Sequence, residues 1–286
     1  MHFPVMLRET LEHLAVRPEG IYADATAGLG GHTGAIAQRL TTGVVAALDC
    51  DAESLELARR STAAWAERIR YRQAKFSELG AALAWMGIEK IDGLVADLGA
   101  SRYQLTEPER GFSLTAAGPL DMRMDRSQGM TAAGLANTTS ERELADLLYH
   151  LGEERRARRI ARAIVRARPM RDTQQLARVV EQAVPRTGRR HPATQTFMAL
   201  RRAVNREAEE LDALLGAAPE LVAKSGRIVV ITFMSLEDRQ VKEAFRELAR
   251  QGRARLLTKH VVRPNEDEVA GNPASRSAKL RAVEMK

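Results

Sequence analysis

A glycine-rich turn followed by a carboxylate is the feature of this chain best suited to bind a cofactor. Gly28, Gly30 and Gly31 lie between a short apolar segment and a helical pattern that begins at His32. Such a turn presents backbone N–H groups to a nucleotide-like ligand. Asp49 stands nineteen residues after Gly30, at the end of a second apolar run. A carboxylate at that position can accept hydrogen bonds from ribose hydroxyls.

The turn departs from the fingerprint of dinucleotide-binding enzymes. In a G-x-G-x-x-G frame set on Gly28, Thr33 occupies the position of the third glycine. We therefore predict an adenosine-type cofactor without a pyrophosphate, and S-adenosylmethionine fits that description. Two alternatives stay open. In one the glycines serve only helix–strand packing, and in the other the chain is a nucleotide-dependent oxidoreductase, against which the missing glycine argues.

The apolar segments around these residues predict a doubly wound, Rossmann-like α/β fold. Strands are expected at 21–25, 44–49, 69–74 and 91–97, with helices at 32–40, 52–66 and 77–86. After residue 97 the alternation stops, and it resumes with a helix at 199–215, a strand at 228–231, a helix at 236–250 and strand-like segments at 254–262 and 278–284. We expect a helical insertion after the fourth strand and an antiparallel edge that closes the sheet.

The positive charge of the chain is concentrated in that insertion. The formal net charge of +7 divides into −2 for residues 1–104, +8 for 105–206 and +1 for 207–286. A helix predicted from Glu153 to about Ala167 alternates arginines with apolar residues, which gives it one cationic face. Such a face suits the phosphate backbone of a nucleic acid. The alternative is a solvated face whose arginines pair with acidic neighbours.

Length and composition limit the remaining classes. The 286 residues predict two domains: a discontinuous cofactor-binding domain (1–104 and 207–286) and an insertion (105–206) for substrate recognition. The longest strongly apolar run, 228–234, is too short to span a membrane, and the N-terminus lacks a secretory pattern. We expect a soluble cytoplasmic protein. Cys50 is the single cysteine, which excludes an internal disulfide, and we expect no metal.

Short strings in a fixed order carry a family resemblance. They comprise the turn from Asp24 to His32, Asp97-Leu98-Gly99, Arg110-Gly111-Phe112-Ser113, Pro119 to Asp125, Gly152-Glu153-Glu154-Arg155, His191-Pro192-Ala193-Thr194 and Ser235-Leu236-Glu237-Asp238-Arg239. In this order they resemble the bacterial MraW-type methyltransferases. The resemblance implies the class I methyltransferase form of the sheet. It also implies S-adenosylmethionine-dependent methylation of the exocyclic N4 of a cytosine in the decoding region of small-subunit (16S) ribosomal RNA, with the small subunit as the expected partner.

The same resemblance implies a set of cofactor contacts. They are Gly30, Gly31, His32, Asp49, Phe76, Asp97 and Gln104. Phe76 would form an apolar wall for the adenine, although a core phenylalanine explains it nearly as well. For His32 the alternative is a polar cap residue of its helix. Asp97 is the catalytic candidate. Cytosine N4 is a poor nucleophile, so acceptors that hold its hydrogens and place it in line with the methyl group would supply most of the catalysis.

Contacts to the substrate are expected from the insertion. The candidates are Arg110, Asp121, Arg123, Asp125, Arg158, Arg159, Arg162 and His191. Asp121 and Asp125 are candidates to assist Asp97 as acceptors. Their alternative role is structural pairing with Arg110, Arg123 or Arg126.

Several positions depart from the family pattern. Met234 stands where the pattern has histidine, and Gln195 and Met198 also differ. An obligatory histidine base would leave this chain impaired. We expect no such base, because the amine loses its proton after methyl transfer and water can accept that proton. A non-catalytic RNA-binding or assembly factor with the same fold is the remaining alternative.

Overall fold

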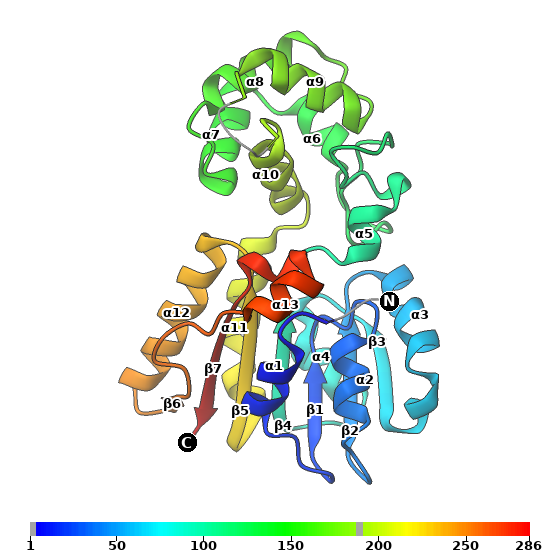
Figure 1. Ribbon diagram of the computed structural model, residues 1–286, viewed down its shortest axis with the longest axis vertical. Coiled ribbons are helices and arrows are strands. Elements are labelled where there is room, and N and C mark those ends of the chain that lie inside the picture. The colour runs from blue at the N-terminus through cyan, green and yellow to red at the C-terminus, as the bar shows by residue number, and fades with distance from the viewer. Residues whose placement is uncertain (1–3, 187–190) are drawn as a thin grey trace. The chain divides into compact units, whose positions relative to one another are not determined.

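The computed structural model describes residues 4–186 and 191–286. The chain divides into two compact units (Figure 1). Met1–Gly99 and Ala208–Lys286 form one, here called the sheet unit, and Ala100–Glu207 form the other, the helical unit.

A seven-stranded sheet forms the centre of the sheet unit. Its order is β3 (Ile69–Gln73), β2 (Val44–Asp49), β1 (Ile21–Asp24), β4 (Ile91–Asp97), β5 (Val222–Thr232), β7 (Lys279–Met285) and β6 (Ala254–Leu256). The first five are parallel, and β7 is antiparallel to both β5 and β6. The predicted doubly wound α/β class is therefore confirmed.

The predicted antiparallel edge is also confirmed, but its strands do not follow chain order. The last strand, β7, lies between β5 and β6, and β6 forms the edge. Leu280, Ala282 and Val283 of β7 are fully buried, as expected of a strand with neighbours on both sides. The strand predicted over 254–262 is much shorter, because β6 ends at Leu256. Short strands are common at sheet edges, where they limit unwanted pairing.

Helices cover both faces of the sheet. On one face α1 (Leu7–Leu14), α2 (Gly31–Ala37) and α3 (Ala52–Ser61) share a hydrophobic cluster with the strands. On the other face α4 (Leu79–Trp85), α11 (Glu207–Leu221) and α12 (Ser235–Arg250) share a second cluster. The predicted helices around the first four strands thus form the two outer layers of the sheet unit.

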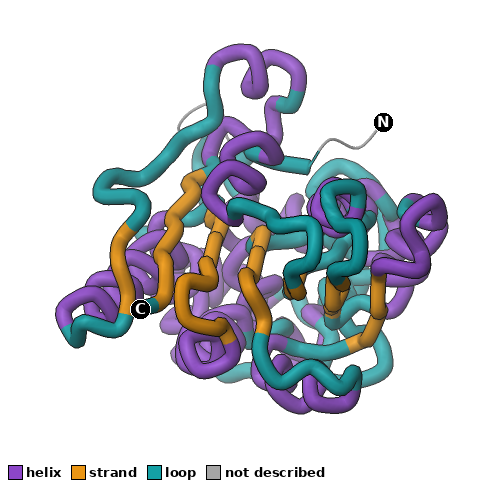
Figure 2. Tube along the Cα trace, turned by 90° about the horizontal axis from the view of Figure 1, so that it is seen from below, coloured by secondary structure: helices purple, strands orange, loops and turns teal. Residues whose placement is uncertain are grey.

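The two clusters follow from the alternation of side chains along each strand. Figure 2 shows the row of strands (orange) with helices (purple) beside it. Adjacent residues of one strand, such as Ile228 and Val229, belong to the two different clusters, because successive strand side chains point to opposite faces.

Two predicted helices are shorter than their apolar patterns. The helix predicted over 52–66 ends at Ser61, where a 3₁₀ segment (Ala63–Arg68) with a non-helical Trp65 takes over. The helix predicted over 199–215 is two helices, α10 (Thr194–Val204) and α11. Arg206 separates them with a φ of 50°, a left-handed conformation that an α-helix cannot contain.

The helical unit has a hydrophobic core of its own. It contains α5 (Arg102–Thr106), α6 (Ala132–Thr138), α7 (Glu141–Gly152), α8 (Ala157–Arg166), α9 (Thr173–Ala183) and α10. Leu144, Leu148, Ile160 and Ile164 are fully buried at its centre. The arginine-rich helix begins at Ala157 rather than at Glu153, because Glu153 has a φ of 53° and ends α7.

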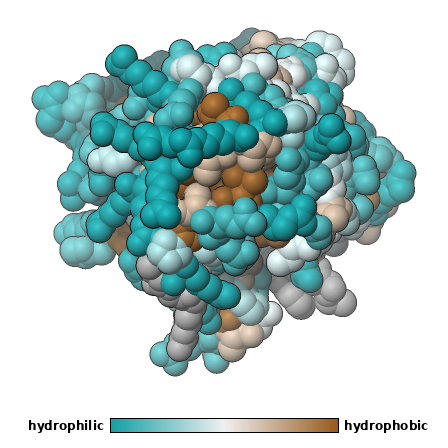
Figure 3. Space-filling view, turned by 90° about the horizontal axis from the view of Figure 1, so that it is seen from above, coloured by the Kyte–Doolittle hydropathy of each residue, from teal (hydrophilic) through white to brown (hydrophobic). Residues whose placement is uncertain are grey.

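The face seen in Figure 3 is mainly hydrophilic, with a small hydrophobic area. Among the described residues, no helix is long and apolar enough to cross a membrane. Residues 4–186 and 191–286 also contain no group of three or more His, Cys, Asp or Glu side chains arranged to hold a metal ion.

Three neighbouring parallel strands of the sheet unit end in aspartate. Asp24 ends β1, Asp49 ends β2 and Asp97 ends β4. The strand order reverses at β1, because β2 and β3 lie on one side of it, whereas β4 and β5, which follow in the chain, lie on the other. In open α/β sheets, ligands bind at the carboxyl ends of strands at this switch point.

Candidate active site

The glycine turn is held by its own packing and by Asp49. Gly28 and Gly30 have φ values of 51° and 87°, and the N–H of Gly28 donates to Asp49 Oδ2 at 2.8 Å. A Cβ at Gly30 would lie 2.7 Å from Ser61 Oγ and 2.8 Å from Thr62 Cγ2. The packing alternative therefore explains Gly30, whereas the bond from Gly28 links the turn directly to the predicted ribose carboxylate.

Asp24 connects the ends of β1 and β4 with helix α2. Its carboxylate is fully buried and accepts from Thr33 Oγ1 at 2.6 Å and from the N–H of Thr26 at 3.1 Å. Thr26 Oγ1 in turn accepts the N–H of Asp97 at 2.7 Å. Burial raises the pKa of Asp24, against the opposing effects of His32 and of these hydrogen bonds. Sequence reasoning missed these roles of Thr26, which belongs to the turn, and of Thr33, which lies in the first turn of α2.

Asp97 carries a carboxylate oxygen whose hydrogen-bonding capacity no described residue uses. Its Oδ1 is buried without a hydrogen-bond partner among the described residues, while the side chain as a whole remains 21% exposed. Its Oδ2 lies 3.9 Å from His32 Nδ1. Burial raises the pKa of Asp97 well above its ordinary value, and the negative charges of Asp24 and Glu268 raise it further. Asp97 is thus poised to accept a hydrogen-bond donor or a positive charge from a ligand.

His32 is oriented by the N-terminal segment. Its Nε2 lies 3.1 Å from the carbonyl oxygen of Val5, so Nε2 carries the proton and Nδ1 faces Asp97. Burial lowers the pKa of His32, and the charge of Asp24 only partly opposes this effect. The imidazole is therefore neutral near pH 7, and His32 is more than a polar cap residue of α2.

Glu268 approaches the same edge from a distant part of the chain. It lies on α13 (Glu266–Gly271), and its Oε1 accepts the N–H of Met6 at 2.6 Å. Burial raises the pKa of Glu268 as well. No local pattern in the sequence singles out Glu268, because only the tertiary fold brings α13 to the N-terminal segment.

Asp49 keeps hydrogen-bonding capacity for a ligand. Its Oδ1 accepts the N–H of Asp51 at 2.9 Å, and its Oδ2 accepts that of Gly28. Burial raises the pKa of Asp49 to about 7. Each carboxylate oxygen has two acceptor positions, so one on each remains for ribose hydroxyls.

The predicted cofactor residues Phe76 and Gln104 differ in their surroundings. Phe76 begins a 3₁₀ segment (Phe76–Glu78) after β3, and its half-buried ring packs against the core of the sheet unit. Gln104 belongs to the helical unit and is 3% exposed. Its Oε1 accepts the N–H of Ser101 at 2.8 Å, as part of a capping box at the start of α5.

Arg110, a predicted substrate contact, lies inside the helical unit. Arg110 is only 1% exposed, and its Nη2 donates to the carbonyl oxygens of Arg123 and Met124 at 3.1 and 3.0 Å. These bonds fix the loop that follows α5. Because the Arg110 guanidinium donates to main-chain carbonyls inside the helical unit, it stabilises that unit and is not exposed at its surface.

Asp121 is paired with an arginine, as its structural alternative proposed, whereas Asp125 bonds to a serine. Asp121 accepts two bonds from Arg123, at 2.7 and 3.0 Å. Burial alone would raise the pKa of Asp121, but the bonds and charge of Arg123 outweigh it and lower that pKa. Asp125 accepts from Ser127 Oγ at 2.6 Å within a local turn.

His191 also has a local role in the helical unit. Its Nδ1 accepts the N–H of Ala193 at 3.1 Å, and its carbonyl oxygen accepts from Thr194 Oγ1 at 2.8 Å, immediately before α10. Its Nε2 lies 3.9 Å from Glu181 Oε1.

The cationic face of α8 is exposed to solvent. Arg158, Arg159 and Arg162 are all exposed, while Ile160 and Ile164 of the same helix are buried. Arg162 pairs with Glu141 at 3.3 Å. The side chains of Arg158 and Arg159 make no hydrogen bond or ion pair with any described residue, so the interpretation as a phosphate-binding face stays open for them.

Comparison with known proteins decides the family. A profile of the MraW methylase family matches residues 1–286. The chain belongs to this family. It is 62% identical to the ribosomal RNA small subunit methyltransferase H of Solibacter usitatus over 286 residues, which are 100% of both chains. Proteins of the same name are 49% identical in Acidobacterium capsulatum, over 100% of this chain and 98% of the relative, and 45% identical in Cyanothece sp., over 99% and 94%.

This member of the MraW methylase family has no ionisable side chain at position 234. Met234 is 8% exposed and precedes α12. Its N–H and that of Phe233 donate to Glu237 Oε2 at 3.1 and 3.2 Å. Because Ile231 of β5 is paired with Asp97 of β4, the segment that contains Met234 leaves the sheet at the same edge as Asp97.

Proposed function

We propose that this chain methylates the exocyclic N4 of a cytosine in the decoding region of 16S ribosomal RNA, with S-adenosylmethionine as the methyl donor. Its membership of the MraW methylase family supports the reaction class, and its relatives are named as small-subunit ribosomal RNA methyltransferases. The observation that carries the proposal is the position of Asp97 at the switch point of the sheet, with an Oδ1 that no described residue satisfies.

The residues at this edge fit S-adenosylmethionine. Asp49 has acceptor positions for two ribose hydroxyls, and the half-buried ring of Phe76 offers an apolar wall. Burial raises the pKa of three carboxyl groups at this edge, those of Asp24, Asp97 and Glu268. A positive charge on a ligand would offset the free energy lost by burying their charged forms. When bound, the cofactor supplies an electrophilic methyl group on a sulfonium.

Asp97 positions the nucleophile in this proposal. Its available oxygen accepts a hydrogen bond from the amine of the cytosine, which keeps the nitrogen lone pair directed at the methyl carbon. After the N–C bond forms, the amine gives up one proton, and water can take it. Neutral His32 lies beside Asp97, with its Nδ1 3.9 Å from Oδ2, so Oδ1 is the oxygen left to the substrate.

The RNA is held by positive charge. Arg158 and Arg159 of α8, which pair with no acidic residue in the described chain, present charges that can replace counterions on phosphates. We assign the substrate to the small ribosomal subunit, in the cytoplasm, because the decoding region forms within that particle.

Methyl transfer to small ribosomal subunits that lack the modification tests the proposal. With isotopically labelled S-adenosylmethionine, the expected product after digestion is N4-methylcytidine. Label in another nucleoside would refute the assigned target. A protein that binds cofactor and RNA but transfers nothing would instead support the assembly-factor alternative, and a parallel titration with NAD tests the oxidoreductase alternative.

A further inference from the structure

Helix α12 carries a line of positive charge on its outer surface. Arg239, Lys242 and Arg246 are spaced three and four residues apart, which places them on one face of the helix. Arg239 and Arg246 are exposed, and Lys242 is half-buried. Glu243 lies four residues after Arg239 and three before Arg246 on the same helix, but it forms no ion pair with either of them in the described part of the chain. We call these three residues the α12 stripe.

The α12 stripe differs from neighbouring arginines in its pairing. Arg250, Arg253 and Arg255 pair with carboxylates, at 2.6, 2.5 and 2.9 Å. In contrast, the side chains of the α12 stripe make no hydrogen bond or ion pair with any residue that the structure describes. Their charges are therefore available to an anion from outside the chain.

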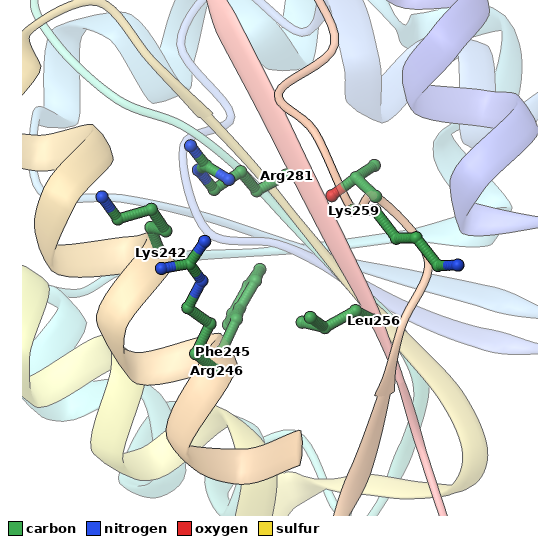
Figure 4. A pocket seen from close by; sticks show the side chains of 7 residues that line it. Lys242, Phe245, Arg246, Leu256, Lys259 and Arg281 are labelled. Atoms are coloured by element: carbon green, nitrogen blue, oxygen red, sulfur yellow. The ribbon is translucent and has the colours of Figure 1, made fainter. Parts of the chain in front are cut away.

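A shallow hollow beside the stripe adds contact surface. It is lined by Lys242 and Arg246 together with Phe245, Leu256 and Arg281 (Figure 4). In Figure 4, Phe245 and Arg246 lie next to each other on α12, and Arg281 extends from β7 above them. Asp238 accepts two bonds from Arg281, at 2.7 and 3.2 Å, so the excess positive charge at the hollow comes from Lys242 and Arg246 of the stripe and from Lys259, which also lines it.

The stripe starts close to the reaction edge. Helix α12 follows β5, and Ile231 of β5 is paired with Asp97. From Arg239 to Arg246 the stripe extends for about 10 Å along the helix, at 1.5 Å per residue. A row of charges of that length suits a chain of phosphates better than a single small anion.

We propose that the α12 stripe binds phosphates of the RNA substrate, so that the sheet unit itself holds the RNA beside the reaction edge. This inference rests on the proposed function. It adds a binding surface outside the cationic face of α8, on the unit that carries Asp97.

The test compares two triple-alanine variants of the full chain. One replaces Arg239, Lys242 and Arg246, and its matched control replaces the paired Arg250, Arg253 and Arg255. Both remove three positive charges. We expect the stripe variant alone to lower affinity for 16S ribosomal RNA and to flatten its log–log salt dependence, by about 0.7 for each single-strand phosphate that is no longer neutralised. A variant with lysine at positions 239 and 246 should keep the parental slope, because phosphate binding depends chiefly on charge.

The outcomes separate this inference from the proposed function. Equal slope changes in both triple variants, or no change in the stripe variant, would overturn the inference while the parent still methylates RNA. A parent that neither binds nor methylates RNA would overturn the proposed function and the inference together. Polyglutamate serves as a second probe. If the stripe variant binds RNA normally but no longer binds polyglutamate, the stripe binds an acidic protein and the inference is overturned. Unchanged melting temperatures establish that the variants are folded.

Discussion

Buried carboxyl groups determine the chemistry at the residue scale. Burial raises the pKa values of Asp24, Asp49 and Asp97, and it lowers that of His32. Each shift means that, without a bound ligand, burial destabilises the charged form of the side chain relative to its neutral form. A ligand that brings hydroxyl donors and a positive charge offsets that cost for the carboxylates, so ligand binding and protonation at this edge are coupled.

The coupling predicts a pH dependence of cofactor affinity. Burial raises the pKa of Asp49 to about 7, so its carboxyl group is largely protonated at pH 6. Ribose hydroxyls donate to the carboxylate form, and binding therefore lowers this pKa and releases a proton. We expect affinity for S-adenosylmethionine to increase as the pH rises toward 7, by at most about tenfold per unit, and to level off above 7. Calorimetry across this range measures the effect.

Asp49→Asn provides the control for that pH dependence. It keeps the shape of the side chain and removes its titration, so the part of the pH dependence due to Asp49 should disappear. Affinity at pH 8 should fall by about 1.5–3 kcal/mol, the range for hydrogen bonds to a charged group. If the variant retains both the affinity and the pH profile of the parent, Asp49 does not bind the ribose.

Asp97 and Met234 can be tested in one assay of single-turnover methyl transfer. Asp97→Asn replaces one acceptor oxygen with a donor group, and we expect the rate to fall on the order of 10²–10³-fold with a smaller change in RNA affinity. Met234→His should raise the rate little, because water accepts the proton. A nearly inactive parent that Met234→His restores would show that a histidine base is required.

At the scale of elements, helix α8 presents its arginines to solvent because Ile160 and Ile164 commit the other face to the core. Replacing Arg158, Arg159 and Arg162 with alanine should weaken RNA binding and reduce its salt slope by up to about one for each phosphate that is no longer neutralised. Cofactor affinity should not change. An unaltered slope in filter-binding measurements would mean that these arginines form only a solvated face.

The packing of the glycine turn against the end of α3 gives a second prediction for the elements. Gly30→Ala places a methyl group 2.7 Å from Ser61 Oγ at a φ of 87°. Gly87→Ala is a matched control, since Gly87 has a φ of 72° and no described atom lies within 4 Å of the added Cβ. Backbone strain costs about 1–3 kcal/mol at such positions. We expect chemical denaturation to show a larger decrease in stability for Gly30→Ala, and equal decreases would remove the packing explanation.

At the scale of the whole molecule, the two units have separate hydrophobic cores. Leu148 of the helical unit and Leu94 of the sheet unit are both fully buried, so replacing either with alanine creates a cavity in the core of its own unit. Each change should cost about 2–5 kcal/mol. We expect amide hydrogen exchange to accelerate in 100–207 for Leu148→Ala and in the strands for Leu94→Ala. Acceleration throughout the chain in both variants would show that the units unfold together.

The sequence alone determined the α/β class, the carboxyl-end positions of Asp49 and Asp97 and the family. Those properties depend on local periodicity and on ordered strings, which the chain displays without folding. Strand boundaries such as 44–49 and 91–97 followed from continuous apolar runs. The helix predicted over 199–215 was wrong because apolar spacing continues across the left-handed Arg206, and spacing does not reveal a single backbone angle.

Only the tertiary structure decided which polar residues are used by the fold and which remain available. Arg110 and Arg158 are the same residue type in one basic segment, yet Arg110 is buried against main-chain carbonyls and Arg158 is exposed. Likewise, Glu268 acts on Asp97 from more than 170 positions away in the chain. Burial and long-range pairing arise from the packing of distant segments, and the sequence encodes that packing without displaying it in any local pattern.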